Sequence, residues 1–431
     1  MSREENRKNF SKYVSQNILG MIGFSCYVLA DSYFISIAKG ADGLTALNLV
    51  MPLYSIIFSI GEMIGVGSAI RYAIGKIKKD ADADDYFWNA IIWCIISSMI
   101  FVFAGIFFSA DIMRILGADE HIVAVGNNYT KIFMCFAPMF MCNYVTNAFV
   151  RNDGAPGIAM SATLFSSLFN IVFDYILMFP MNLGMEGAAL ATALSPIIGM
   201  GICSIHFFSK KSRVRLVVCK PSVRKLVAGC QLGVSAFVGE MSSAVITLAF
   251  NFVILKLAGN VGVAAYGVVA NIAIVTTAVF NGVAQGSQPL ISSCFGRGDK
   301  DGCTQLKRMG YTTAFVLAAV MYSILFIFAG QFVAVFNSEG SEMLRLYATE
   351  GVKLYFIGIF FAGINIVGGG AFSATEDAFK AAVVSVARGF VLILGAVFVM
   401  SALFGMTGVW LAYAVAEGIT TFIMLVMALR V

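Results

Sequence analysis

Five carboxylates lie deep inside long apolar runs of this chain: Asp31, Glu62, Asp174, Glu240 and Glu417. A charged side chain in such a run is costly, roughly 2.5–3.5 kcal/mol at the centre of a bilayer, and it marks a function by default. Burial disfavours the ionised form of an acid, so these side chains could take up a proton or a metal cation. The alternative is a set of interhelical hydrogen bonds that only hold the helices together.

Spacing places further polar groups beside two of these acids. The pairs at i and i+4 are Tyr27 with Asp31, Asn143 with Asn147, and Asn170 with Asp174. Residues at this spacing share one face of a helix, so each pair forms a polar patch. All three pairs fall in the first half of the chain, which is therefore predicted to hold an ion site. Glu62 and Glu240 fit a structural or a functional role equally well, and Glu417 in the last span is assigned a structural or peripheral role.

The elements that must position these residues are membrane-spanning helices. Of the 431 residues, 59% are hydrophobic and only 12% are charged, about half the charged fraction of a soluble protein. A window of about 20 residues, enough to cross a bilayer as a helix, selects twelve segments. They are 13–37, 43–72, 86–109, 122–150, 157–179, 185–208, 226–256, 262–294, 309–336, 344–374, 380–403 and 407–429. The sequence therefore predicts an all-α polytopic membrane protein.

The basic residues predict how the spans are oriented. Lys and Arg number 22 in the N-terminal arm, every second loop and the C-terminus, and 4 in the alternate loops. Basic loops stay in the cytoplasm, so both termini are expected there, in a multi-pass protein of the cytoplasmic membrane. The richest loop, 209–225, is predicted to link two six-helix bundles, 1–208 and 226–431. The net charge of +5 comes from these loops and needs no nucleic-acid partner.

The two halves of the chain resemble each other. LGMEGAALATALS at 183–195 matches FGMTGVWLAYAVA at 404–416, at an offset of 221 along the chain. YTKIFMCFAPMF at 129–140 matches GVKLYFIGIFFA at 351–362, at an offset of 222. Six spans per half is an even number, so both halves face the same way across the membrane. Parallel repeats of this kind are a transporter architecture, with the substrate path between the halves. A channel would usually be a ring of subunits, whereas this duplication lets a monomer function.

Other chemistries find no support in the sequence. The nine cysteines and two histidines form no metal-binding pattern or nucleophile–base pair. GVGSAIRYAIGK ends like a phosphate-binding loop but lacks one of the motif's glycines and the Ser or Thr that should follow the lysine. We therefore expect neither an enzyme nor a resident cofactor, and energy would come from an ion gradient.

Five stretches of the chain are similar to one known family. They are YVLADSYFISIAKGADGLTALNLVMPL, AFVRNDGAPGIAM, NIVFDYILMF, GMEGAALATALS and NGVAQGSQPLISSCFGRGD. Together they resemble the multidrug and toxic compound extrusion (MATE) family, in the branch of the DNA-damage-inducible and MepA-like exporters. The resemblance implies a V of two six-helix bundles around a central cavity. It also implies export of organic cations in exchange for H⁺ or Na⁺.

The resemblance also assigns roles to residues. Asp31 matches the family's acid in the first helix, Asn170 and Asp174 match its N-x-x-x-D fifth helix, and Thr192 would complete their polar cluster. Tyr27, Tyr129 and Asn147 would surround that cluster. Carboxylates, an amide and a hydroxyl are hard oxygen ligands, so Asp31, Asn170, Asp174 and Thr192 could also bind Na⁺. The other main branch carries acids in helices seven and ten; here helix ten offers only Asn365, and Glu240 lies about one turn from the expected place.

These features predict a cation-coupled antiporter that exports small organic cations across the lipid bilayer by alternating access. The alternative is a flippase for a lipid-linked precursor in the same superfamily. A flippase would need basic side chains in its cavity to hold a pyrophosphate.

Overall fold

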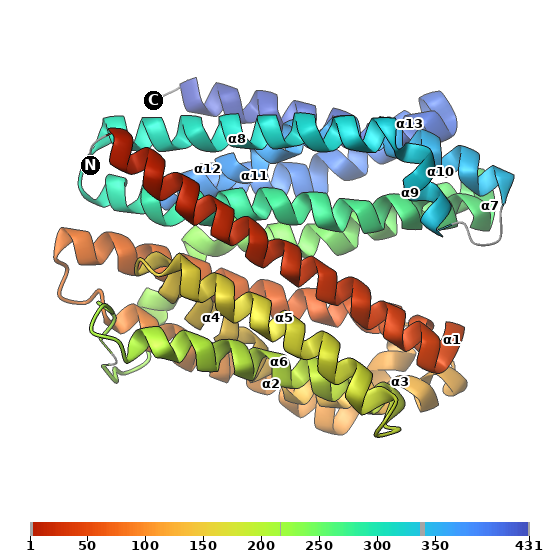
Figure 1. Ribbon diagram of the computed structural model, residues 1–431, viewed down its shortest axis with the longest axis horizontal. Coiled ribbons are helices and arrows are strands. Elements are labelled where there is room, and N and C mark those ends of the chain that lie inside the picture. Colours follow the sequence, from red (N-terminus) through yellow and green to blue (C-terminus); the bar gives the residue numbers. More distant parts are fainter. Residues whose placement is uncertain (1–2, 216, 337–340, 430–431) are drawn as a thin grey trace. The chain divides into compact units, whose positions relative to one another are not determined.

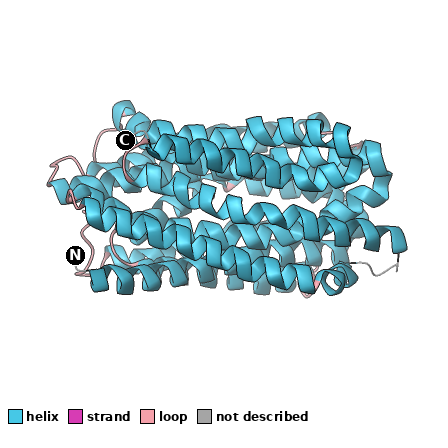
Figure 2. Cartoon of the chain, turned by 90° about the horizontal axis from the view of Figure 1, so that it is seen from above, coloured by secondary structure: helices cyan, strands magenta, loops and turns pink. Residues whose placement is uncertain are grey.

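The computed structural model describes residues 3–215, 217–336 and 341–429. Within these ranges all regular structure is helical (Figures 1 and 2). The elements are α1 (Arg3–Lys78), α2 (Asp85–Ile115), α3 (Glu120–Cys135), α4 (Ala137–Asn152), α5 (Pro156–Met178), α6 (Gly184–Phe207), α7 (Val223–Gly296), α8 (Lys300–Ile327), α9 (Ala329–Phe336), α10 (Glu342–Tyr355), the 3₁₀ turn η1 (Phe356–Gly358), α11 (Ile359–Ala374), α12 (Ala378–Val386), the π turn η2 (Ala387–Val391) and α13 (Leu392–Leu429).

Breaks within these helices explain the number of membrane spans. Nine helices in the described residues are long and apolar enough to cross a bilayer, or ten when the bent pair of α3 and α4 is taken as one span. Two of these nine are themselves double, because α7 turns at Gly259 and the 378–428 segment turns at Gly405. Counting their halves separately gives the twelve spans predicted from hydropathy, and the all-helical fold is confirmed.

The repeat seen in the sequence is also present in the backbone. Gly40 and Gly259, at an offset of 219, both break a helix at a φ near +60°, a conformation that glycine adopts without steric cost. Gly184 and Gly405, at an offset of 221, form a second such pair, with φ of 51° and 59°. The left-handed positions therefore recur at nearly the same offsets as the matched sequence motifs.

The chain divides into two compact units. The N-terminal unit consists of residues 15–237 and 292–299, and the C-terminal unit of residues 1–14, 238–291 and 300–431. In the N-terminal unit α5 runs along α6, and α2 packs against α3 and α4. In the C-terminal unit α11 packs against α8, α12 and α13.

The boundary between the units differs from the break expected around 209–225. That segment is held on the N-terminal unit, since the backbone N–H of Arg215 donates to Asp84 Oδ1 over 3.1 Å and that of Ser222 donates to Asn89 Oδ1 over 2.7 Å. The start of α7 also packs closely on α1: a Cβ on Gly229 would lie 2.7 Å from Ser68 Oγ. These contacts carry the N-terminal unit into α7, as far as residue 237.

Candidate functional site

Asn170, Asp174 and Thr192 form the centre of a buried polar cluster in the N-terminal unit. The first two lie on α5 and the third on α6, and all three side chains are at most 2% exposed. α5 begins at Pro156, whose missing N–H is no loss in the first turn of a helix. With its amide oriented to satisfy both neighbours, Asn170 Nδ2 donates to Asp174 Oδ2 over 3.1 Å and its oxygen accepts from Thr192 Oγ1 over 3.2 Å. The structure therefore brings together three of the four residues predicted for the ion site.

Asp31, the fourth predicted residue, lies in the first half of α1 and is also buried, with 6% of its surface exposed. It lies close enough to Asp174 for the two carboxyls to interact electrostatically. One oxygen of each acid, Oδ1, is buried and makes no hydrogen bond in the described part of the chain. Neither acid forms an ion pair with a basic residue in those ranges. Two buried carboxylates without a counter-ion are costly when both are charged, so a proton or cation is favoured there.

Two tyrosines extend the cluster. The hydroxyls of Tyr54 and Tyr129 are hydrogen-bonded to each other, and both interact electrostatically with Asp31 and Asp174. The ring of Tyr54 stacks on Phe133 with centroids 3.6 Å apart, which fixes the direction of its hydroxyl. Tyr129 was predicted near the site but Tyr54 was not, because a tyrosine in an apolar span resembles ordinary packing. Only the fold brings it to the acids.

The remaining predicted residues lie at different distances from this cluster. Tyr27 is half-buried and interacts electrostatically with Tyr54, so it borders the site. Asn147 does not join it: its Nδ2 donates to Ala159 O and to Thr163 Oγ1, both over 3.2 Å, and thereby ties α4 to α5.

Asn143 faces α6 and not the acids. Its Oδ1 packs closely against α6, since a Cβ added to Gly199 would lie only 2.7 Å from this oxygen. The oxygen makes no hydrogen bond among the described residues. Glu62 interacts electrostatically with Arg151, a buried base on α4, so it belongs to a separate charged pair. Glu240 lies half-buried on α7 in the C-terminal unit.

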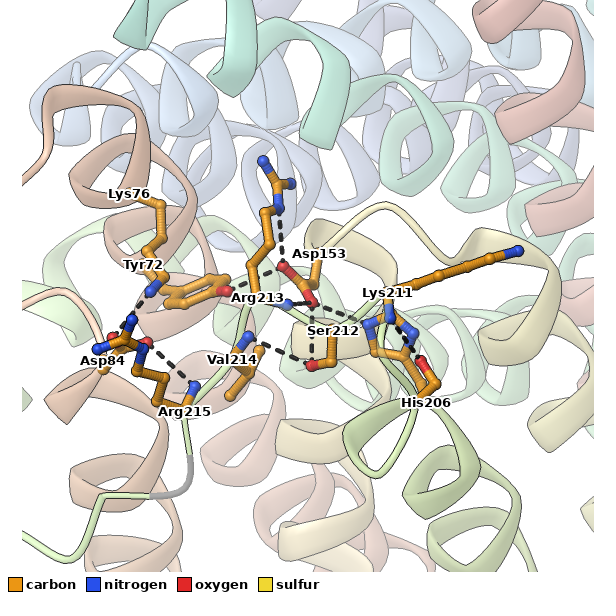
Figure 3. Close-up of polar contacts among 11 residues, drawn as sticks. Tyr72, Lys76, Asp84, Asp153, His206, Lys211, Ser212, Arg213, Val214 and Arg215 are labelled. Carbon is orange, nitrogen blue, oxygen red and sulfur yellow. Dashed lines mark hydrogen bonds and ion pairs between the residues drawn. The ribbon is translucent and has the colours of Figure 1, made fainter.

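A second buried acid that the sequence did not single out is Asp153, in the turn between α4 and α5 (Figure 3). Its carboxylate is buried and accepts five hydrogen bonds. The donors are Tyr72 Oη at 2.8 Å, His206 Nε2 at 2.8 Å, Ser212 Oγ at 3.3 Å, and Arg213 through its backbone N at 2.8 Å and its Nε at 3.3 Å. We call this the Asp153 anchor. It joins α1, α6 and the segment that follows α6, and its acid is fully paired, unlike Asp31 and Asp174.

A duplicated set of membrane-spanning helices with buried acids in one half is typical of one class of protein, the membrane transporters. The chain belongs to the MATE family, because the family model MatE matches residues 17–176 and 236–399. This confirms the family that the sequence motifs indicated.

Individual relatives agree with this assignment. The multidrug export protein MepA of Staphylococcus saprophyticus is 26% identical over 410 residues, and that of Staphylococcus aureus strain bovine RF122 / ET3-1 is 28% identical over 416. Each alignment covers 93% of this chain and 89% of the relative. The predicted MepA-like branch is thus also confirmed.

Solved structures share the fold. A multidrug resistance MATE family transporter of the MOP superfamily, in an outward-facing conformation, superposes with a TM-score of 0.92 at 20% identity, over 99% of this chain and 96% of the other. A MOP superfamily transporter from Pyrococcus furiosus Vc1 (DSM3638) superposes with a TM-score of 0.90, also at 20% identity, over 99% and 95%. That second protein is described as having a binding pocket of reverse polarity that suggests a different function.

Proposed function

We propose that this protein is a cation-coupled antiporter that exports organic cations across the cytoplasmic membrane. One observation carries the proposal: Asp31 and Asp174 are buried near each other, each with an oxygen that makes no hydrogen bond, and neither has a basic partner in the described ranges. The MepA relatives are named as multidrug export proteins, which supports the same substrate class. The internal repeat supports function as a monomer. The excess of Lys and Arg in every second loop supports an orientation with both termini in the cytoplasm.

The donor set favours a proton over Na⁺ as the coupling ion. Asn170 presents its N–H₂ group to Asp174, and its oxygen is engaged by Thr192. Among the described residues, Oδ1 of Asp174 is then left without a hydrogen bond, as is Oδ1 of Asp31. A proton needs only one oxygen, whereas a metal cation binds to several at once. Asn170 and Thr192 thus orient Asp174 and do not act as metal ligands themselves.

The exchange follows from the charge of the two acids. While both are ionised, their repulsion holds the first half of α1 in one packing against α5, and the protein binds a cationic substrate. Protonation removes that repulsion, so α1 repacks and the substrate is released outward. Tyr54 and Tyr129 provide hydroxyls beside the acids through which a proton can reach them. Alternation between the two charge states then couples inward proton flow to outward substrate flow.

The flippase alternative requires basic side chains that are available to an anionic head group. Two bases inside the helices are engaged elsewhere: Arg151, which is buried, with Asn17 and Glu62, and Arg388, which is half-buried, with Glu417. This pairing weighs against a pyrophosphate ligand. The Pyrococcus structure, whose pocket is described as suggesting a different function, agrees with the general rule that a fold does not determine function.

The test is uptake of a fluorescent organic cation into inverted proteoliposomes under a pH gradient and, separately, under a Na⁺ gradient. We expect the pH gradient to drive transport, and D174N and D31N to abolish the coupling. D111N removes the same charge from an acid that is 60% exposed and should behave like the wild type. Gradient-driven transport that persisted in D174N and D31N would contradict the assignment of these acids.

A further inference from the structure

The C-terminal unit also contains a buried membrane acid, Glu417 on α13, but this one is fully paired. Its side chain is 2% exposed and accepts from Arg388 of the π turn, through Nη2 to Oε1 at 2.8 Å and through Nε at 3.1 and 3.3 Å. Asn365 Nδ2 on α11 donates to Oε2 over 2.7 Å, and Thr421 Oγ1 donates to Asn365 Oδ1 over 3.0 Å. An Arg that engages both oxygens of a carboxylate is a strong, directional pair.

The backbone is specially shaped to form this pair. Arg388 lies in η2, a single π turn between α12 and α13, and such turns are rare and often lie at functional sites. Gly389 next to it packs so closely on α7 that a Cβ would lie 2.7 Å from Ser242 Cβ. The helix thus departs from regular α geometry where its charged residue points at Glu417.

The internal repeat shows that the ion pair of Arg388 and Glu417 occurs in one half of the chain and has no charged counterpart in the other. Glu417 corresponds to Pro196 at the offset of 221, and Asn365 corresponds to Asn143 at the offset of 222. Arg388 falls at Ser166 or Ser167, and Ser166 Oγ donates to the backbone oxygen of Ser195 over 2.6 Å. The equivalent positions in the N-terminal unit therefore include no charged side chain.

The reverse holds for the place that corresponds to the acid cluster. Asp31 corresponds to Phe250 at the offset of 219, and Thr192 to Tyr413 at 221. Phe250 stacks on Tyr266 with centroids 5.0 Å apart, and Tyr413 stacks on Tyr355 at 4.4 Å. Aromatic rings thus occupy the two positions that correspond to Asp31 and Thr192.

We propose that Arg388 is an internal counter-ion that keeps Glu417 charged throughout the transport cycle, so that coupling is confined to the acids of the N-terminal unit. This inference rests on the proposed function. Arg388 acts as a positioning residue: it offsets the cost of a buried carboxylate that would otherwise take up a proton. The titratable groups that interact with Glu417 are Arg388, Tyr413 and Tyr355, and Tyr266 interacts with Tyr413.

Infrared difference spectroscopy of the purified protein, between acid and alkaline pH, tests the charge of Glu417 directly. The wild type and E417Q should show the same protonated-carboxyl bands across the pH range in which transport occurs. R388Q should gain a band that disappears in R388Q/E417Q, because Glu417 without its counter-ion binds a proton. If the wild type showed a protonated-carboxyl band that E417Q lacks, Glu417 would be protonated in the wild type and the proposal would be overturned, even if R388Q did not fold. The proposal would also be overturned if R388Q showed the same bands as the wild type.

Transport provides the second readout. The pH profile of gradient-driven export should shift in R388Q and return to the wild-type profile in both R388K and R388Q/E417Q. R345Q is the matched control, since Arg345 forms an exposed pair with Glu342 and its loss should not move the profile. If the wild type showed no gradient-driven export, the proposed function would be wrong, and the infrared spectra would still test the charge of Glu417. If the wild type exported substrate and R388Q had the same pH profile, only the counter-ion role of Arg388 would be refuted.

Discussion

At the scale of single residues, the chain treats its buried acids in two opposite ways. Asp153 and Glu417 accept hydrogen bonds on both oxygens, whereas Asp31 and Asp174 each keep an oxygen without a partner in the part of the chain that the structure describes. A fully satisfied carboxylate stabilises one structure, and an unsatisfied one can change its protonation state. The unpaired oxygens, more than burial alone, therefore distinguish the two acids that we propose to couple transport.

Thr192 offers a mild test of this distinction. Thr192→Val keeps the shape of the side chain but removes the hydroxyl that donates to Asn170. The amide oxygen then keeps only the backbone N–H of Thr192, at 3.2 Å. Loss of the other hydrogen bond should cost about 0.5–1.5 kcal/mol of stability, and the amide can turn away from Asp174 more easily. We expect weaker coupling, measured as less substrate exported per imposed pH gradient. Thr420→Val is the control, because that hydroxyl donates to Ala416 O in its own helix; an equal loss in both variants would argue against the role of Thr192.

At the scale of elements, glycine turns determine where α7 and α13 are divided into two spans. Gly405 has φ of 59° and ψ of −137°, a conformation that side-chain-bearing residues rarely adopt, and an alanine there is expected to cost about 1–3 kcal/mol. Gly395, earlier in the same α13, is helical, and a Cβ there would meet no neighbouring helix or side chain among the described residues within 4 Å. G405A should therefore lower the melting temperature of the purified protein, while G395A should raise it slightly, since alanine is the better helix former by up to about 1 kcal/mol. Equal melting temperatures for the two variants would contradict this view of the turn.

The Asp153 anchor makes a prediction about the segment after α6. Asp153→Ala removes the acceptor for Tyr72, His206, Ser212 and Arg213. Loss of one member of a buried charged network costs about 3–5 kcal/mol, so the melting temperature should fall and residues 209–215 should be cleaved faster in limited proteolysis. The number of protons exchanged per substrate should stay the same in the protein that remains folded. A change in that ratio would mean that the anchor takes part in coupling.

These elements also show what the sequence could and could not predict. Hydropathy located the spans because a bilayer imposes a length, and the i, i+4 spacing found Asn170 beside Asp174 because a helix fixes that geometry. Tyr54, His206 and Arg388 gave no such local signal, since their partners lie on other helices. The unit boundary inside α7 was also out of reach, because it depends on close packing at Gly229 and not on composition.

At the scale of the whole molecule, duplication followed by divergence accounts for the asymmetry between the halves. Both halves keep the left-handed turns at matching positions, so the backbone of the repeat is preserved. The side chains differ: one half has an unpaired acid cluster, and the other has aromatic rings and a paired acid. If the acid cluster couples transport as we propose, only one set of acids has to change charge in each cycle.

If one set of acids links the two ligands, substrate and proton must oppose each other at equilibrium as well as during transport. A ligand stabilises the state that it binds, by about 2.7 kcal/mol at roughly 100 times its Kd, and the coupling between two ligands is reciprocal. A saturating organic cation should therefore raise the melting temperature at alkaline pH, and the increase should shrink as the pH falls and the acids bind protons. In the D31N/D174N double variant the increase should be small and independent of pH, whereas D111N should follow the wild type. A substrate-induced increase that stayed the same at all pH values in the wild type would show that proton and substrate do not compete through these acids.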